Sequence, residues 1–212
     1  MEPILSWIAD GSGSGKTTVT RKLIEKLFLP KNPCTGKIVV IQHDSYYKDI
    51  SAFGSKKGFE INNDHPDSLD TPLLLRHLKR LKNSLPIEKP KCDFTTYRRL
   101  KSKKLVQPEK VFILEGIFIF SDRAFRDPMD INVFIDTHDD ERLLKRLRRD
   151  TMERGRSIKS VISQYTHPVK PMHLEFVDPS KRWADIVIPK GGENDVAIAM
   201  LSFRIRSLIG ED

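Results

Sequence analysis

The most informative chemistry lies in residues 10–18, which read Asp-Gly-Ser-Gly-Ser-Gly-Lys-Thr-Thr between an apolar run and an amphipathic pattern. Glycines let successive backbone N–H groups converge on phosphate oxygens, and the N-terminus of a following helix adds positive charge. A flexible Gly/Ser linker is not expected between a strand and a helix with Lys-Thr-Thr at the junction. Lys16 is predicted to reach the β and γ phosphates of a nucleoside triphosphate, and the Thr17 hydroxyl to bind magnesium. The predicted phosphate-binding residues are Gly11, Ser12, Gly13, Ser14, Gly15, Lys16, Thr17 and Thr18.

Asp10 departs from the usual pattern of such a loop, whose first glycine falls six positions before the lysine. A carboxylate about 5 Å from a phosphate oxygen, at an effective dielectric constant of about 20, costs roughly 3 kcal/mol. A side chain can also crowd the loop. The sequence does not determine which way Asp10 points, so weakened triphosphate binding is a hypothesis.

Two further carboxylates follow or end apolar runs. Asp44 comes directly after the run 37–42, at the end of a predicted strand, where open α/β sheets bind ligands. It could accept a proton from an attacking hydroxyl, help to hold magnesium, or simply cap a turn. Glu115 ends the apolar run 111–114, where a charge is costly without a partner, which favours a role in holding magnesium and its water.

Residues 142–156 form a basic segment that follows the apolar run 131–135. A solvated helix face explains some of its bases, whereas Arg154-Gly155-Arg156 is typical of a lid whose guanidinium groups clamp phosphates. We expect about half of these bases to be functional. They are Arg142, Lys145, Arg146, Arg148, Arg149, Arg154 and Arg156.

The formal net charge of +8 is compatible with a solvated surface, a small anionic partner such as ATP, or a nucleic acid. The bases are spread over several segments, and only 8% of residues are aromatic, too few for a base-stacking platform. We therefore rank a solvated surface first, an ATP-sized partner second and a nucleic acid a distant third.

Other sequence features exclude several classes of protein. Cys34 and Cys92 are the only cysteines and lie far apart, which argues against a disulfide framework or a zinc site. The longest apolar stretch, 111–120, is interrupted by Glu115 and is about half as long as a bilayer requires. The first residues do not resemble a secretory signal. We expect a cytoplasmic protein with no membrane or nucleic-acid partner.

Apolar runs alternate with helical patterns, which predicts an α/β fold with a mostly parallel sheet flanked by helices. A helix capped by Ser68 or Asp70 and one capped by Thr137 are expected, as is a helical stretch from Ser157 onward. Residues 85–107 interrupt the alternation and predict an inserted β-hairpin. The predicted strands span 4–9, 37–42, 111–114, 131–135 and 185–188, and helices are predicted at 16–27 and 195–208.

In combination, these segments resemble the uridine kinase (uridine-cytidine kinase) family, within the phosphoribulokinase/uridine kinase group of P-loop kinases. The resemblance covers about residues 4–201. It rests on the motifs DGSGSGKTT, HDSYYKD, NDHPDSLD, CDFTTYRR, ILEGI, RRDTMERGR, SQY and ADIVIPKGGEN.

The resemblance implies a single kinase domain over 1–212, with the hairpin over a nucleoside site and an Arg-rich lid at about 149–160. It implies magnesium, ATP or GTP as phosphate donor, a nucleoside substrate, and a homo-oligomer, specifically a tetramer. Asp44 would be the base for the ribose 5′-hydroxyl, with Lys16 and Arg149 also catalytic. Magnesium would be held by Thr17, Asp44 and Glu115. Arg154 and Glu193 would join the phosphate-binding loop at the nucleotide, and the nucleoside would be bound by Asp64, Tyr47, Cys92, Phe94, Tyr97, Arg146, Arg156 and Gln164.

Three positions depart from the family pattern around the base: Asn63, where an aromatic residue is common, Cys92, which replaces a tyrosine, and Tyr97, where many members have histidine. The hydrogen-bonding reach of a tyrosine differs from that of an imidazole, so the choice of base stays open. Uridine, cytidine or another riboside or sugar phosphate are alternatives. A nucleotide-binding regulator with weak activity is a rival suggested by Asp10, while the absence of an N-K-x-D motif makes a GTPase switch less favoured.

Overall fold

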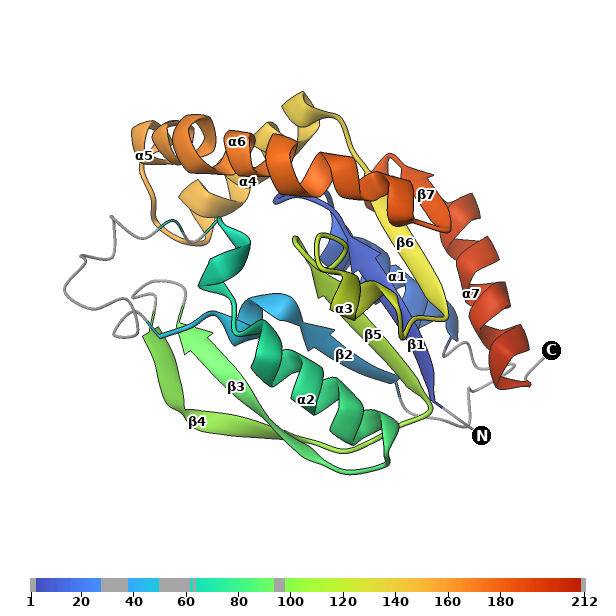
Figure 1. The fold of residues 1–212 in the computed structure, drawn as a ribbon. Helices are drawn as coiled ribbons and strands as arrows, with labels where there is room; N and C mark the ends of the chain where they lie inside the picture. The colour runs from blue at the N-terminus through green and yellow to red at the C-terminus, as the bar shows by residue number, and fades with distance from the viewer. Residues whose placement is uncertain (1–2, 28–37, 50–61, 63, 94–97, 211–212) are drawn as a thin grey trace.

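The computed structural model describes residues 3–27, 38–49, 62, 64–93 and 98–210. Its centre is a parallel sheet in the order β2-β5-β1-β6-β7 (Figure 1). The sheet confirms the predicted α/β fold, with strand ends that differ from the predicted ones by at most two residues. The strands are β1 Ile4–Ala9, β2 Ile38–Gln42, β5 Val111–Gly116, β6 Ile131–Asp136 and β7 Ile186–Pro189.

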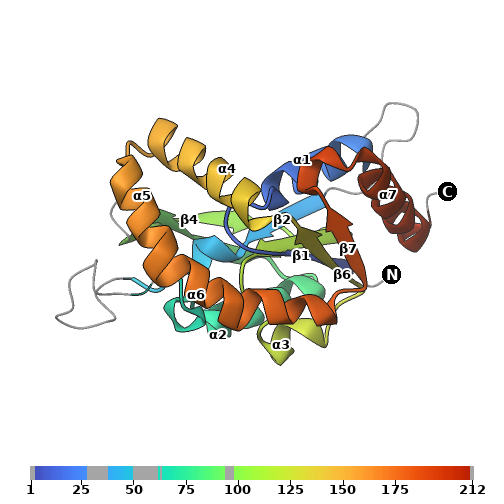
Figure 2. The same cartoon turned by 90° about the horizontal axis from the view of Figure 1, so that it is seen from above.

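Helices cover both faces of this sheet and continue beyond its edge. Figure 2 shows α1 and α7 on one side of the sheet and α2 and α3 on the other. The helices are α1 Lys16–Leu27, α2 Thr71–Lys82, α3 Arg123–Arg126, α4 Asp139–Met152, α5 Ile158–Gln164, α6 Lys170–Met172 and α7 Asp195–Ile209. Among the described residues, no helix combines the length and the apolar character needed to cross a bilayer.

The sheet separates two hydrophobic cores because alternate residues of each strand point to opposite faces. On β1, Trp7 belongs to the core beneath α2, and Ile8 belongs to the core beneath α1 and α7. Both side chains are fully buried. This double burial explains why the predicted strands read as nearly continuous apolar runs.

The segment after α5 remains helical up to Trp183, but its winding is irregular. Wider π-helical turns occupy Tyr165–Val169 and His173–Val177, on either side of α6. Pro168 and Pro171 lie in this stretch and lack the N–H group that a regular α-helix would use. The predicted helical stretch from Ser157 therefore exists, with Ser157 accepting a hydrogen bond as the cap of α5.

The predicted hairpin is also present, as a separate antiparallel pair of β3 Ile87–Asp93 and β4 Arg98–Val106. It packs on the short turn that follows β2. The Cys92 thiol lies 3.2 Å from the Ser45 carbonyl oxygen, and the Arg99 guanidinium donates to the carbonyl oxygens of Tyr46 and Tyr47. The hairpin thus supports the backbone that directly follows Asp44.

The predicted helix caps have different outcomes. Asp70 caps α2, since its carboxylate accepts a hydrogen bond from the Leu73 N–H at 3.2 Å. The prediction that Thr137 caps the next helix is wrong, because α4 begins after His138, which makes no side-chain cap bond. The Thr137 hydroxyl instead donates to the Ser14 carbonyl oxygen at 2.9 Å and ties the phosphate-binding loop to the start of α4.

Candidate active site

The loop between β1 and α1 has the conformation that its glycines allow. Gly13 and Gly15 have φ values of +85° and +93°, which side-chain-bearing residues rarely adopt. A Cβ atom at Gly13 would also clash with the carbonyl oxygen of Arg142 on α4. Lys16 extends back over the loop, and its ammonium donates to the carbonyl oxygens of Asp10 and Gly11, each at 2.8 Å.

Asp10 lies at the base of this loop with 2% of its surface exposed. One carboxylate oxygen accepts a hydrogen bond from the Gly11 N–H, whereas the other, Oδ2, is buried without a hydrogen-bond partner in the structure. Burial raises the pKa of Asp10 to about 6, despite the opposing effects of Lys16 and Arg142. Its φ of +153° lies in the range that favours glycine. Asp10 therefore occupies one loop N–H and introduces buried charge.

Asp44 and Glu115 come from two neighbouring strands and meet at the same edge of the sheet. In the parallel pairing of β2 and β5, Gln42 lies opposite Glu115, and Asp44 follows two residues later. Burial raises the pKa of Asp44, and the nearby positive charges of Lys16, Arg149 and Arg154 oppose this rise. The lysine of the loop and two of the arginines predicted for a lid thus act directly on the predicted base.

Glu115 lies beside the first turn of α1. It accepts hydrogen bonds from the hydroxyl groups of Thr20, at 3.1 Å, and Thr17, at 3.5 Å. Burial raises the pKa of Glu115, and the negative charge of Asp44 adds to the rise. The two carboxylates are therefore close enough to repel each other, a repulsion that a bound cation would relieve.

This set of oxygens fits magnesium better than a metal held by protein ligands alone. Magnesium is usually bound by one or two carboxylates together with phosphate oxygens and water. The described part of the chain contains no group of three or more His, Cys, Asp or Glu residues that could hold a metal. Thr17, Asp44 and Glu115 supply a hydroxyl and two carboxylates beside the predicted phosphate site. These three side chains therefore fit a magnesium ion.

The arginines predicted for a lid gather around a carboxylate that sequence reasoning missed. Asp150 on α4 has no exposed side-chain surface and forms ion pairs with Arg146, Arg149, Arg154 and Arg156. Its position in an arginine-rich run, four residues from both Arg146 and Arg154, was a signal that could have found it. Arg149 also donates to the Ser12 hydroxyl of the phosphate-binding loop, at 3.4 Å.

Asp64 forms a second acidic centre with other residues of the same lid. Burial raises the pKa of Asp64, while the charges of Arg146 and Arg156 oppose this rise. The side-chain oxygen of Gln164 accepts hydrogen bonds from both arginines, at 3.4 Å from Arg146 and 2.6 Å from Arg156. The structure thus brings together four of the residues predicted for the nucleoside site.

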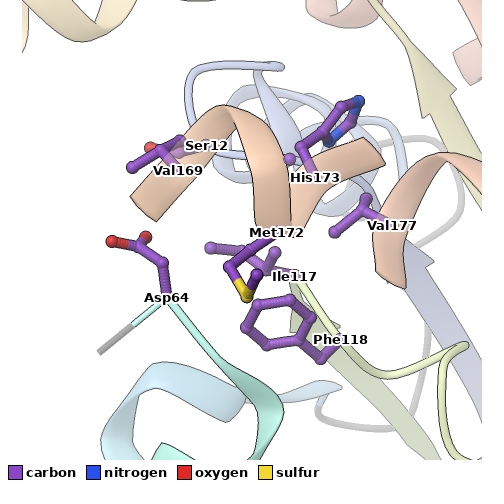
Figure 3. Close-up of a pocket in the computed structure, with 9 residues that line it drawn as sticks. Ser12, Asp64, Ile117, Phe118, Val169, Met172, His173 and Val177 are labelled. Carbon is purple, nitrogen blue, oxygen red and sulfur yellow. The ribbon is translucent and has the colours of Figure 1, made fainter. Parts of the chain in front are cut away.

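A pocket lies between Asp64 and the phosphate-binding loop (Figure 3). In Figure 3, Met172, Ile117 and Phe118 form an apolar wall beside the Asp64 carboxylate. Sequence reasoning identified only the polar rim of this pocket, because its apolar wall comes from the irregular helix and the segment after β5. The lining residues are Gly11, Ser12, Asp64, Ile117, Phe118, Val169, Met172, His173 and Val177.

Three other predicted site residues lie near these centres without a contact that tests their roles. Glu193 is exposed in the turn Gly191–Glu193, whose Gly192 packs closely against the side chain of Thr18. The Cys92 thiol points to the backbone carbonyl oxygens of Ser45 and Tyr47, in the segment after β2, and the Tyr47 side chain is half-buried. Their nucleotide and nucleoside roles stay predictions. Phe94, Tyr97 and Asn63 lie outside the described residues.

Comparison with known proteins decides the family to which this arrangement belongs. Residues 6–197 match the phosphoribulokinase / uridine kinase family. The chain belongs to this family. It is 45% identical over 208 residues to a uridine kinase of Ligilactobacillus salivarius, covering 98% of this chain and 95% of that protein. It is also 43% identical over 210 residues to a uridine kinase of Streptococcus mutans, covering 99% and 98% of the two chains.

Solved structures of low sequence identity share the fold. A protein described as a possible uridine kinase from Bacillus stearothermophilus superposes with a TM-score of 0.61 at 21% identity, over 89% of both chains. A D-glycerate 3-kinase from Cryptococcus neoformans gives a TM-score of 0.58 at 18% identity, over 84% of this chain and 81% of that one. These two likenesses show that the fold is shared.

Proposed function

We propose that this protein is a uridine/cytidine kinase, which transfers the γ-phosphoryl group of ATP or GTP to the 5′-hydroxyl of uridine, cytidine or both. The observation that carries the proposal is the pairing of two acidic centres with one phosphate-binding loop. Asp44 lies in the field of Lys16, Arg149 and Arg154, and Asp64 lies in the field of Arg146 and Arg156. The relatives named uridine kinase match nearly the whole chain, which supports the same assignment.

In the proposed reaction, Asp44 accepts the proton of the 5′-hydroxyl as its oxygen attacks the γ phosphorus. The bond between that phosphorus and the oxygen bridging to the β phosphate breaks, and this oxygen leaves with ADP. Burial raises the pKa of Asp44, so its carboxylate is a better proton acceptor than an exposed one. When bound by Thr17, Asp44 and Glu115, magnesium would supply charge neutralisation at the β and γ phosphates.

Lys16 and Arg149 stabilise the transferring group in this proposal. The Lys16 ammonium must exchange the carbonyl oxygens of Asp10 and Gly11 for phosphate oxygens when the triphosphate binds. Arg149 donates to the Ser12 hydroxyl of the loop. Arg149 and Arg154 both form ion pairs with Asp150. Guanidinium groups at these positions can form bidentate hydrogen bonds with phosphate oxygens.

On the nucleoside side, Asp64 would accept hydrogen bonds from the ribose 2′- and 3′-hydroxyls, with Arg146, Arg156 and Gln164 around the sugar. Tyr47, Cys92, Phe94 and Tyr97 would lie near the base. We further propose a cytoplasmic homo-oligomer, specifically a tetramer, as the family resemblance implies. Light scattering during size-exclusion chromatography would measure the oligomer's mass directly.

A second candidate is a family member with weak turnover or with another riboside or sugar phosphate as acceptor. The buried Asp10 favours the first variant of this reading, because it places charge beneath the triphosphate site. The residues that depart from the family pattern around the base, Asn63, Cys92 and Tyr97, favour the second.

A panel of acceptors with magnesium and ATP tests the proposal, with ADP release as the measurement. The proposal predicts turnover with uridine or cytidine and rejection of 2′,3′-dideoxyuridine, because Asp64 would be left unpaired at a cost of roughly 1–3 kcal/mol or more. Equal kcat/KM for uridine and its dideoxy analogue would rule out the role of Asp64. Turnover only with purine ribosides or sugar phosphates would establish the second candidate.

A further inference from the structure

Asp150 has a geometry that divides its two carboxylate oxygens between two sets of arginines. Oδ1 is 2.9 Å from Arg149 Nε and 3.2 Å from Arg154 Nη1. Oδ2 is 3.6 Å from Arg146 Nε and 3.7 Å from Arg156 Nη1, and it makes no hydrogen bond. Asp150 therefore binds Arg149 and Arg154 closely, whereas it attracts Arg146 and Arg156 over a longer distance.

These two sets of arginines act on different parts of the active site. Arg149 and Arg154 act on Asp44, beside the phosphate-binding loop. Arg146 and Arg156 act on Asp64 and share Gln164 as a hydrogen-bond acceptor. Asp150 is therefore the side chain that the proposed triphosphate contacts and nucleoside contacts have in common.

Positive charges outnumber negative ones in this cluster, because four guanidinium groups share the fully buried carboxylate of Asp150 and the carboxylates of Asp44 and Asp64. The neighbouring guanidinium groups repel one another. Burial lowers the pKa of Arg154, and the charges of Arg149, Arg156 and Arg146 lower it further, against the effect of Asp150. A bound triphosphate would supply new acceptors to Arg149 and Arg154. The attraction of Asp150 would then fall mainly on Arg146 and Arg156, and the repulsion across the cluster would decrease.

We infer that Asp150 is a positioning residue that couples the two substrate sites, so that binding of the triphosphate strengthens binding of the nucleoside and the reverse. This inference rests on the proposed function. Coupling of this kind is reciprocal, so each substrate must raise the affinity for the other by the same factor.

Titration calorimetry on the full chain tests the inference, with magnesium and the non-hydrolysable analogue β,γ-imido-ATP as one ligand and uridine as the other. We expect wild type to bind the analogue about tenfold more tightly in the presence of saturating uridine. In Asp150→Asn the factor should fall to near one, even though each substrate still binds. The control is Asp140→Asn, which alters an exposed carboxylate on the same helix and should keep the wild-type factor.

The ratio of affinities separates coupling from a merely structural role, since general loosening of the lid would weaken both binding steps without removing their dependence on each other. A wild-type protein that binds both ligands independently overturns the inference but leaves the proposed function intact, and this measurement needs no variant to fold. An Asp150→Asn protein with the wild-type factor also overturns it. If wild type binds no nucleoside at all, the proposed function and the inference fail together.

Discussion

At the scale of single residues, the proposed chemistry depends most on Asp44. Its carboxylate lies at the carboxyl end of β2, in the field of Lys16 and two arginines, and burial raises its pKa. Asp44→Asn keeps the size of the side chain and removes the proton acceptor. We expect kcat to fall by a factor of about 10²–10⁴, while uridine binding is largely retained. Steady-state kinetics and calorimetry measure the two effects, and near-normal turnover of the variant would eliminate Asp44 as the base.

Asp10 should weaken triphosphate binding, because its buried carboxylate adds negative charge beneath the loop and occupies the Gly11 N–H. We expect a gain of about tenfold in ATP affinity on its removal, once the screening effect of magnesium and Lys16 is included. Asp10→Asn and Asp10→Gly should be compared by titration with ATP. An equal gain in both variants identifies charge as the cause, and a gain in the glycine variant alone identifies backbone geometry, because φ is +153°. Unchanged affinity in both would contradict the expectation.

The same carboxylate should make the stability of the ligand-free protein depend on pH. Burial raises the pKa of Asp10 from 3.8 to about 6, so the folded state binds the proton more tightly than the unfolded chain. The penalty is absent below about pH 4, grows as the pH rises and is complete above about pH 6, where it amounts to about 3 kcal/mol. Asp10→Asn should therefore gain stability over wild type across this window. Thermal unfolding from pH 4 to pH 8 measures the difference, and a difference that does not change with pH would refute the cause.

At the scale of secondary-structure elements, the start of α4 and the phosphate-binding loop fit together closely. Gly13 has a φ of +85°, and a Cβ atom there would clash with the Arg142 carbonyl oxygen. Gly13→Ala should therefore combine backbone strain of about 1–3 kcal/mol with a steric clash and should weaken ATP binding. Thermal unfolding and ATP titration measure both effects.

Gly210 provides a matched control for this substitution. It also has a positive φ, of +74°, but a Cβ atom there would meet no atom within 4 Å. Gly210→Ala should lose only the stability that backbone strain accounts for and should bind ATP normally. Equal losses in the two variants would show that the close approach of α4 has no effect.

Elements whose signals are local could be predicted from the sequence. The apolar runs of β1, β5 and β6, the hairpin and the Asp70 cap each depend on periodicity or on side chains a few residues apart. The prediction that Thr137 caps a helix was wrong because its hydroxyl donates to the carbonyl oxygen of Ser14, which is distant in the chain. A local pattern contains no information about such a partner.

In the candidate site, the charged residues could be predicted from the sequence, whereas the apolar residues could not. Its charged residues follow strand ends or lie in short motifs, so their convergence could be predicted from the parallel sheet. The apolar wall of Met172, Ile117 and Phe118 could not, since it depends on where the irregular helix crosses the sheet. The spacing of Asp150 from Arg146 and Arg154 indicates ion pairs along a helix, but it does not reveal that the Asp150 carboxylate is fully buried.

At the scale of the whole molecule, the parallel sheet explains why residues from distant segments meet. The phosphate-binding loop, Asp44 and Glu115 come from β1, β2 and β5, which lie side by side and point the same way. In Figure 1, α4 to α6 lie beyond the carboxyl ends of these strands. The arginines predicted for a lid and Asp64 thus lie at the same edge of the sheet, where the triphosphate and the nucleoside are proposed to meet.

The most direct test of this account is transfer of labelled γ-phosphate from ATP to uridine in the presence of magnesium, with the product identified by chromatography and phosphorus NMR. The proposed function predicts uridine 5′-monophosphate and ADP in equal amounts from the wild-type protein, and a loss of most product with Asp44→Asn. Absence of labelled nucleotide with both uridine and cytidine, from a folded protein that binds ATP, would contradict it.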